Sequence, residues 1–217
     1  MSIKGLKFIN CRHAVPDVDK WFAIYQDMDG KGFHKDLGIK YSIVAKLEKK
    51  DDKGNPRVSV THFFPSECEE KVLAVVDLSK NGKLQELQEA GIIIGDIKAL
   101  TGVAGLDRTA EFSKKGMSFY YGSHGVSDQE GWLKLYSEVA PPMDEKNKVA
   151  GSIAFLCKEK HSSGKQTIAV MNFLKAEDMA ALKGFYNMSQ PPWSTDLIPN
   201  GAVILPWDAE SGTILLG

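Results

Sequence analysis

The sequence predicts an α+β protein in which two tandem units share one β-α-β-β-α-β fold. One segment occurs twice, as HAVPDVDKWFAIYQDM in residues 13–28 and as HGVSDQEGWLKLYSEV in residues 124–139. The identical pairs are His13/His124, Val15/Val126, Asp17/Asp128, Trp21/Trp132 and Tyr25/Tyr136. In addition, residues 40–67 align without a gap with residues 150–177, and the pairs include Ser42/Ser152, Gly54/Gly164, Val60/Val170 and Phe63/Phe173. Internal similarity of this extent indicates a tandem duplication.

Each half begins with the pattern of a strand followed by an amphipathic helix. Residues 6–15 are rich in β-formers, and Asp17 is a favourable N-cap for the segment that follows. That segment places apolar side chains at helical spacing, namely Trp21, Ile24, Tyr25 and Met28. The second half repeats the pattern with residues 117–126, the N-cap Asp128 and the stripe Trp132, Leu135, Tyr136 and Val139. We expect both helices to bury this stripe against a sheet, which favours packing roles for the tryptophans and tyrosines.

The remainder of each half supplies a hairpin, a second helix and a last strand. Residues 41–48 and 57–64 read as strands joined around Gly54, and residues 151–159 and 167–173 read as strands joined around Gly164. Helical stretches are expected at 67–78 and 177–185, and final strands at 97–101 and 202–206. This order is the ferredoxin-like arrangement. The predicted domains are residues 1–105 and 117–217, joined by a polar linker at 106–116, with an extra helix at 83–90 in the first half only.

Composition indicates an ordinary globular protein with a neutral ligand. The chain has 217 residues, 27 basic and 28 acidic, with a net charge of −1 and no long run of one sign, so nucleic acid and membrane surfaces are not expected partners. No signal peptide or membrane-spanning segment is recognisable, and the three cysteines lack disulfide or zinc spacing. We therefore expect a cytoplasmic protein.

The pattern resembles a known superfamily. A strand ending in H-x-V-x-D and a helix carrying W-x-x-x-Y, inside a β-α-β-β-α-β unit, are similar to the dimeric α/β-barrel superfamily, which includes proteins like antibiotic-biosynthesis monooxygenases and stress-responsive proteins. The resemblance implies that the two ferredoxin-like units pack as a fused dimeric α/β barrel, an intramolecular pseudo-dimer that can form further homo-oligomers. The matching residues describe the fold and not a reaction.

Histidines are the candidate catalytic residues. His13 and His124 lie near the ends of the first strands, and His62 lies on the third strand of the first half. Imidazole suits proton transfer near neutral pH, although a histidine bonded to nearby backbone is the alternative reading. The residues expected to contact a ligand are Tyr41, Tyr120 and Asn172, the last being the counterpart of His62. We expect the site inside one half of the barrel, with chemistry in the first half because it supplies two imidazoles.

Standard cofactor and nucleotide motifs are absent from the sequence. There is no G-x-G-x-x-G, no P-loop, no G-x-S-x-G and no H-E-x-x-H, so no cofactor and no metal site are predicted. RNA-recognition modules share the strand order, but RVSVTHFF and QTIAVMNF lack their glycine and interleaved aromatic residues. Two functions remain: a cofactor-independent monooxygenase, isomerase or cyclase acting on a small apolar or aromatic molecule with a strand-borne histidine as base, or a non-catalytic small-ligand-binding or stress-related barrel. A cavity of roughly 300 Å³ or more facing these histidines would favour a site.

Overall fold

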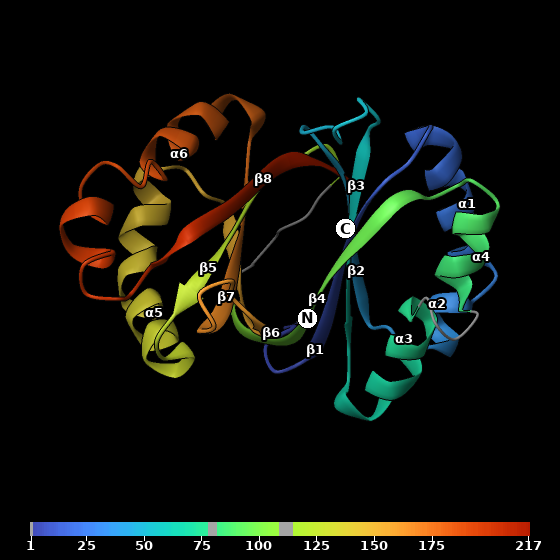
Figure 1. Ribbon diagram of the computed structural model, residues 1–217, viewed down its shortest axis with the longest axis horizontal. Helices are drawn as coiled ribbons and strands as arrows, with labels where there is room; N and C mark the ends of the chain where they lie inside the picture. The colour runs from blue at the N-terminus through green and yellow to red at the C-terminus, as the bar shows by residue number, and fades with distance from the viewer. Residues whose placement is uncertain (1, 78–81, 109–114) are drawn as a thin grey trace.

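The computed structural model describes residues 2–77, 82–108 and 115–217. Within these residues, eight antiparallel strands close into one barrel in the order β1-β3-β2-β8-β5-β7-β6-β4. Figure 1 shows helices packed outside the barrel on two opposite sides. The strands are β1 (Lys7–Ala14), β2 (Tyr41–Leu47), β3 (Arg57–Phe64), β4 (Ile94–Arg108), β5 (Ser118–Val126), β6 (Gly151–Lys160), β7 (Gln166–Leu174) and β8 (Ile204–Leu216).

Helices of the two halves cover separate parts of the barrel. Those of the first half are α1 (Val18–Gly30), α2 (Phe33–Asp36), the 3-10 helix η1 (Ser66–Cys68), α3 (Glu69–Val76) and α4 (Lys83–Glu89). Those of the second are α5 (Gln129–Lys146), the 3-10 helix η3 (Ala176–Asp178), α6 (Met179–Phe185) and the π-helical η4 (Trp193–Leu197). The first set lies at one end of Figure 1 and the second set at the other end.

The strand order keeps each half together. Around the barrel, the adjacent strands β4-β1-β3-β2 come from the first half of the chain, and the adjacent strands β8-β5-β7-β6 come from the second half. The barrel closes through the strand pairs β2–β8 and β4–β6. A closed barrel leaves no unpaired edge strand. The two halves are therefore joined by backbone hydrogen bonds at both seams.

Strand alternation separates two buried faces. The barrel interior is an apolar core that includes Phe8, Phe63, Phe119, Phe155 and Phe173. On β1 the neighbouring positions Ile9 and Cys11 instead join the cluster beneath the helices. Both faces of the sheet are thus covered in this part of the molecule.

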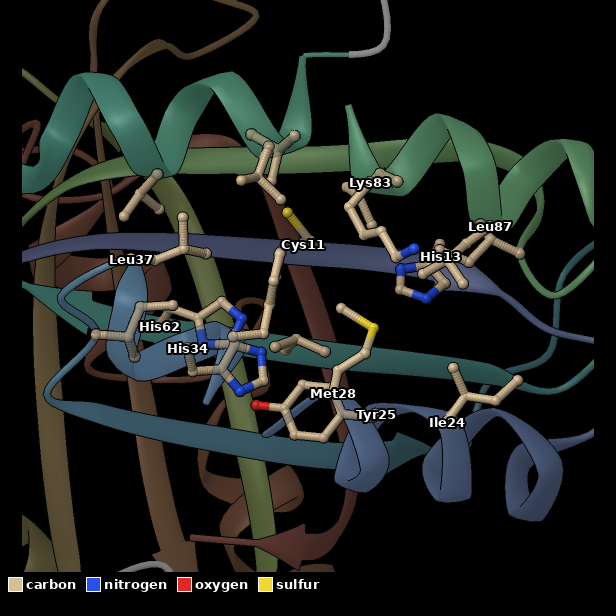
Figure 2. A pocket seen from close by; sticks show the side chains of 18 of the residues that line it. Cys11, His13, Ile24, Tyr25, Met28, His34, Leu37, His62, Lys83 and Leu87 are labelled. Atoms are coloured by element: carbon tan, nitrogen blue, oxygen red, sulfur yellow. The ribbon is translucent and has the colours of Figure 1, made fainter. Parts of the chain in front are cut away.

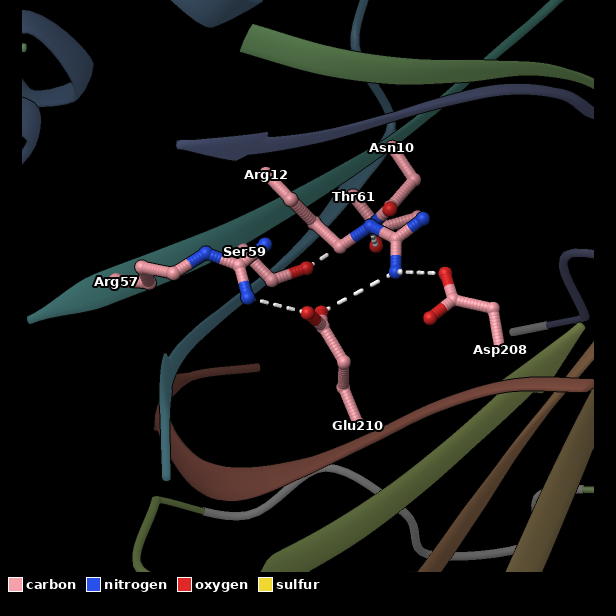
Figure 3. Close-up of polar contacts among 7 residues, drawn as sticks. All are labelled: Asn10, Arg12, Arg57, Ser59, Thr61, Asp208 and Glu210. Carbon is pink, nitrogen blue, oxygen red and sulfur yellow. Dashed lines mark hydrogen bonds and ion pairs between the residues drawn. The ribbon is translucent and has the colours of Figure 1, made fainter. Parts of the chain in front are cut away.

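The interior also holds a polar cluster (Figure 3). Arg12 of β1 contacts Glu210 of β8 at 3.2 Å and Asp208 at 3.3 Å, and Arg57 of β3 contacts the other oxygen of Glu210. The Arg12 guanidinium also lies 4.9 Å from the centre of the Tyr121 ring. These ion pairs connect two strands of the first half to the last strand of the second.

The two expected N-caps are confirmed. The Asp17 carboxylate accepts hydrogen bonds from the backbone N–H groups of Asp19 and Lys20, and Asp128 accepts one from Glu130. Each carboxylate satisfies backbone donors that have no partner within the helix. Capping thus occupies the two aspartates that could otherwise be considered as bases.

The apolar stripe is buried as expected only in the first half. Trp21 and Tyr25 are buried, and Ile24 and Met28 are half-buried beside α4, whereas Leu135 and Val139 of the second half are 40% and 38% exposed. The prediction for α5 was therefore wrong at these two positions. In the second half, η4 takes the place that α4 has in the first, and it lines a small cavity together with Leu135 and Val139 but leaves both side chains partly exposed.

The last strands are longer than predicted. β8 runs to Leu216 instead of ending near Pro206, and β4 runs to Arg108, into the segment expected to be a linker. Residues 109–114 of that expected linker lie outside the described residues. Polar residues such as Asp208 and Glu210 interrupt the apolar alternation by which a strand is recognised in the sequence. In the barrel, these two carboxylates pair with Arg12. In the part of the chain that is described, no helix is long and apolar enough to cross a membrane.

Candidate functional site

A cavity of about 80 Å³ lies between the outer face of the sheet and the helices of the first half. Strands β1 and β3 form its floor, and helices α1 to α4 form its walls (Figure 2). The polar residues at the cavity are His13, Tyr25, His34, His62 and Lys83, and most of the remaining lining is apolar. Figure 2 shows His13 beside Lys83 at one end, while Tyr25, His34 and His62 gather at the other.

His13 is a buried histidine without a protein partner. Its side chain is 2% exposed, and neither ring nitrogen has a hydrogen-bond partner among the described residues. The Trp21 ring meets it edge-on at 5.6 Å between centroids. Burial, together with the charge of Arg57, lowers the pKa of His13 to about 4, so the ring is neutral at neutral pH. A buried unpaired polar group is costly, and a ligand or water in the cavity would offset that cost.

His62 lies at the other end of the cavity. Its Nδ1 is 2.8 Å from the Ser42 hydroxyl on the neighbouring strand β2. Burial, and secondarily the nearby His34, lowers the pKa of His62 to about 3. In the tautomer whose Nδ1–H donates to the Ser42 hydroxyl, Nε2 carries the lone pair and is the ring nitrogen that can take a proton from a ligand.

His34 and Tyr25 complete this end of the cavity. The centroid of the His34 ring is 4.8 Å from those of both His62 and Tyr25. The His34 Nδ1–H donates to Asp29 Oδ1 at 2.9 Å. The Tyr25 hydroxyl is buried without a hydrogen-bond partner in the described part of the chain, and burial raises its pKa well above the ordinary value.

The expected position of the site was wrong in one respect. His13 and His62 do face one cavity, but on the helix side of the sheet and not inside the barrel. The interior positions of the same strands are taken by Phe8 and Phe63 of the apolar core and by Arg12 and Arg57 of the polar cluster. The cavity is also smaller than the 300 Å³ expected of a site that encloses a drug-sized molecule. A ligand of more than a few atoms therefore requires side chains such as Met28, with its three rotatable bonds, to move aside.

The corresponding space in the second half is filled by aromatic side chains. Trp207 stacks on His124 at 5.1 Å and on Tyr186 at 5.3 Å. The Trp207 ring lies directly over Gly122, where an added Cβ would be 2.1 Å from it. Only a residue without a side chain permits this close approach. The remaining cavity measures about 50 Å³.

Second-half candidate residues are bonded within the protein. The His124 Nδ1–H donates to the carbonyl of Gly125 at 2.9 Å, and Asn172 Nδ2 donates to the hydroxyl of Tyr186 at 3.0 Å. Burial lowers the pKa of His124 to about 4. His124 faces the small second cavity, but Asn172 does not line it.

The tyrosines expected to contact a ligand lie elsewhere. Tyr41 packs against the barrel core, 6.2 Å from the ring of Phe63, and Tyr120 stacks on Tyr186 at 5.1 Å. Neither lines the first-half cavity, and Tyr120 instead lines an open pocket of about 360 Å³ beside Lys183 and Glu210. The structure thus places His13 and His62 at opposite ends of one cavity and leaves Tyr41, Tyr120 and Asn172 outside it.

Sequence reasoning missed His34 and the polar role of Tyr25. His34 lies in α2, a single helical turn that follows Gly32 at φ 84°. The GKG segment before it reads as a loop, and nothing in the spacing shows that this loop returns His34 to the sheet. The Asp29/His34 pair, five residues apart across that turn, was the available signal.

The chemistry of the cavity is that of neutral proton donors and acceptors in an apolar space. Two imidazoles held neutral by burial and a buried phenol can orient a small molecule and take a proton from it. Among residues 2–77, 82–108 and 115–217, no group of three or more His, Cys, Asp or Glu side chains is arranged to hold a metal ion.

Comparisons with solved structures identify the fold. An anthrone oxidase-like protein superposes with a TM-score of 0.61 at 10% identity, covering 99% of this chain and 93% of that one. A candidate monooxygenase of Fusobacterium nucleatum gives 0.55 at 8% identity, covering 98% and 93%. Chlorite dismutase of Candidatus Nitrospira defluvii gives 0.52 at 11% identity, covering 97% and 91%. The chain has the dimeric α/β-barrel fold.

Sequence comparisons add nothing to this assignment. No family model matches the chain, and no curated protein is significantly similar to it in sequence. At identities near 10%, the structural similarity establishes the dimeric α/β-barrel architecture and not a reaction.

Proposed function

We propose that the protein is a cofactor-independent enzyme that removes a proton from a small apolar or aromatic molecule in the first-half cavity. His62 on strand β3 is the base. His13 on strand β1 holds an oxygen of the ligand and stabilises the negative charge that develops on it. The observation that carries the proposal is that His13, with two unpaired ring nitrogens, and His62 face one apolar cavity. Deprotonation is the first step shared by isomerases, cyclases and enzymes in which the carbanion then reacts with dioxygen.

Two further observations support the proposed reaction, and two others support the tandem duplication and the location. The structural neighbours include a candidate monooxygenase and an anthrone oxidase-like protein. The contrast between an open first cavity and an aromatic-filled second one fits one working and one degenerate site of a tandem duplicate. The matching strand orders of the halves, β4-β1-β3-β2 and β8-β5-β7-β6, support two ferredoxin-like units from such a duplication. The three free cysteines support a reducing, cytoplasmic location.

The proposal predicts that single His→Gln substitutions in the first cavity abolish proton abstraction. The probe is nitrobenzisoxazole, a small aromatic molecule whose ring opens to a coloured phenolate when a base removes its C–H proton. We expect kcat/KM to fall about 100-fold or more in His62→Gln and His13→Gln, the usual contribution of a positioned base or donor. His124→Gln should have a much smaller effect, because that ring is already bonded to Gly125.

The alternative is a non-catalytic small-ligand-binding or stress-related protein with the same barrel. The small volume of the cavity, about 80 Å³, favours this alternative if its side chains do not move aside to admit a substrate. Saturable binding of the probe without ring opening, in the wild type and in all three variants, would establish the ligand-binding alternative in place of the enzyme.

A further inference from the structure

His34 occupies a position between the first-half cavity and the protein surface. Its side chain is 7% exposed, whereas the Asp29 carboxylate that accepts its Nδ1–H is 52% exposed. The hydrogen bond of 2.9 Å fixes the ring so that Nδ1 carries the proton and Nε2 carries the lone pair. The Asp29 carboxylate therefore contacts the imidazole of His34 and is also accessible to solvent.

A proton on His62 needs somewhere to go. Burial holds the pKa of His62 at about 3, so an imidazolium at this position is costly once it has formed. The His34 ring packs against the His62 ring, with 4.8 Å between the centroids and 45° between the ring planes. An imidazole backed by a carboxylate stabilises the positive charge that His62 cannot hold.

We propose that Asp29 and His34 form a proton-accepting pair behind His62, through which a proton removed from a ligand reaches the protein surface; this assignment rests on the proposed function. The ligand C–H bond breaks, its electron pair stays on the ligand, and the proton binds His62 Nε2. The proton then passes to the lone pair on His34 Nε2, which leaves His62 neutral and His34 as an imidazolium paired with Asp29. It finally leaves to water beside the exposed carboxylate or returns to the product.

Few other ionisable groups surround His34. Tyr25 of α1 and His62 of β3 pack against its ring, and Phe33 meets it edge-on. Lys71 of α3 reaches the backbone carbonyl of Asp36 at the end of α2, and farther along the cavity are Cys11, His13 and Lys83. Asp29 is the acidic group recorded in contact with His34 among the described residues.

The second half lacks this arrangement. The counterpart of His62 is Asn172, whose amide donates to Tyr186 and cannot take up a proton at neutral pH. The proposed proton path therefore belongs to the half that keeps an open cavity.

Asp29→Ala tests the pair, with Asp27→Ala as the matched control. Asp27 lies on the same helix, is 58% exposed and pairs with Lys31 at 2.6 Å, outside the cavity. In protein labelled with ¹⁵N at histidine, long-range ¹H–¹⁵N spectra should place the neutral His34 proton on Nδ1. Asp29→Ala, which removes the acceptor, should convert this ring to a mixture of tautomers, and Asp27→Ala should leave it unchanged. A His34 proton on Nε2 in the wild type overturns the proposal, because Nε2 then has no lone pair to accept a proton.

Chemical rescue supplies a second readout that a structural role would not move. Asp29→Ala should lower kcat for nitrobenzisoxazole opening at least about tenfold with little change in KM, and added formate should restore much of the rate through the exposed position. Asp27→Ala should show neither effect. Loss of rate without rescue overturns the assignment to Asp29. If the wild type fails to open the ring, the proposed function fails for this probe, and the pair is decided by the spectra alone.

Discussion

Glu210→Gln is expected to lower the free energy of unfolding by about 3–5 kcal/mol, the usual cost of removing one partner from a buried ion pair. The Glu210 side chain is 7% exposed and pairs with Arg12 and Arg57, which are themselves nearly buried. Without its negative charge, two arginines would remain inside the barrel, and among the described residues the exposed carboxylate of Asp208 would be the remaining acidic contact of Arg12. Urea denaturation, with the midpoint and the slope both fitted, measures the effect.

Asp208→Asn is the matched control for this substitution. Asp208 contacts the same arginine, Arg12, at 3.3 Å but is 57% exposed. Exposed ion pairs contribute little because water screens them, so we expect a loss below about 1 kcal/mol. Equal losses in the two variants would mean that Glu210 is not a buried link between the halves.

Local sequence signals account for most of the secondary structure and for the repeat of its order. Asp17 and Asp128 identified the starts of α1 and α5, and Gly54 and Gly164 identified the two hairpin turns. These signals depend on residues close together in the chain, so they can be recognised without knowledge of the tertiary contacts.

The faces of the strands could not be assigned from alternation alone. On β1, the set Asn10 and Arg12 looks like a solvent face, and the set Ile9 and Cys11 looks like a core face. In the barrel both sets are buried, and the polar set points inward because Glu210 of a distant strand neutralises Arg12. The two-residue periodicity of a strand separates its side chains into two faces, but it does not show whether solvent, helices or other strands cover each face.

The candidate site was predictable at two positions only. His13 and His62 share a face because their strands pair directly, with His13 opposite Val58 and His62 opposite Ile9. His34 and the filling of the second cavity depend on packing between segments far apart in the chain. Trp207 can occupy that cavity only because Gly122 of another strand has no side chain. No pattern within either segment contains that information.

Trp21→Ala should destabilise the fold by about 3–5 kcal/mol, the usual cost of truncating a buried tryptophan, whereas Trp132→Ala should cost clearly less. The repeat alone predicts equal effects, but the structure separates them. Trp21 is 4% exposed and packs on His13 and Tyr25, while Trp132 is only half-buried, on a helix whose neighbouring Leu135 already faces solvent. Urea midpoints of the two variants, compared with wild type, test the difference. Near-wild-type stability of Trp21→Ala combined with lost probe binding would instead mean that Trp21 contacts the ligand. Equal losses of stability in the two variants would show that α5 packs on the sheet as tightly as α1.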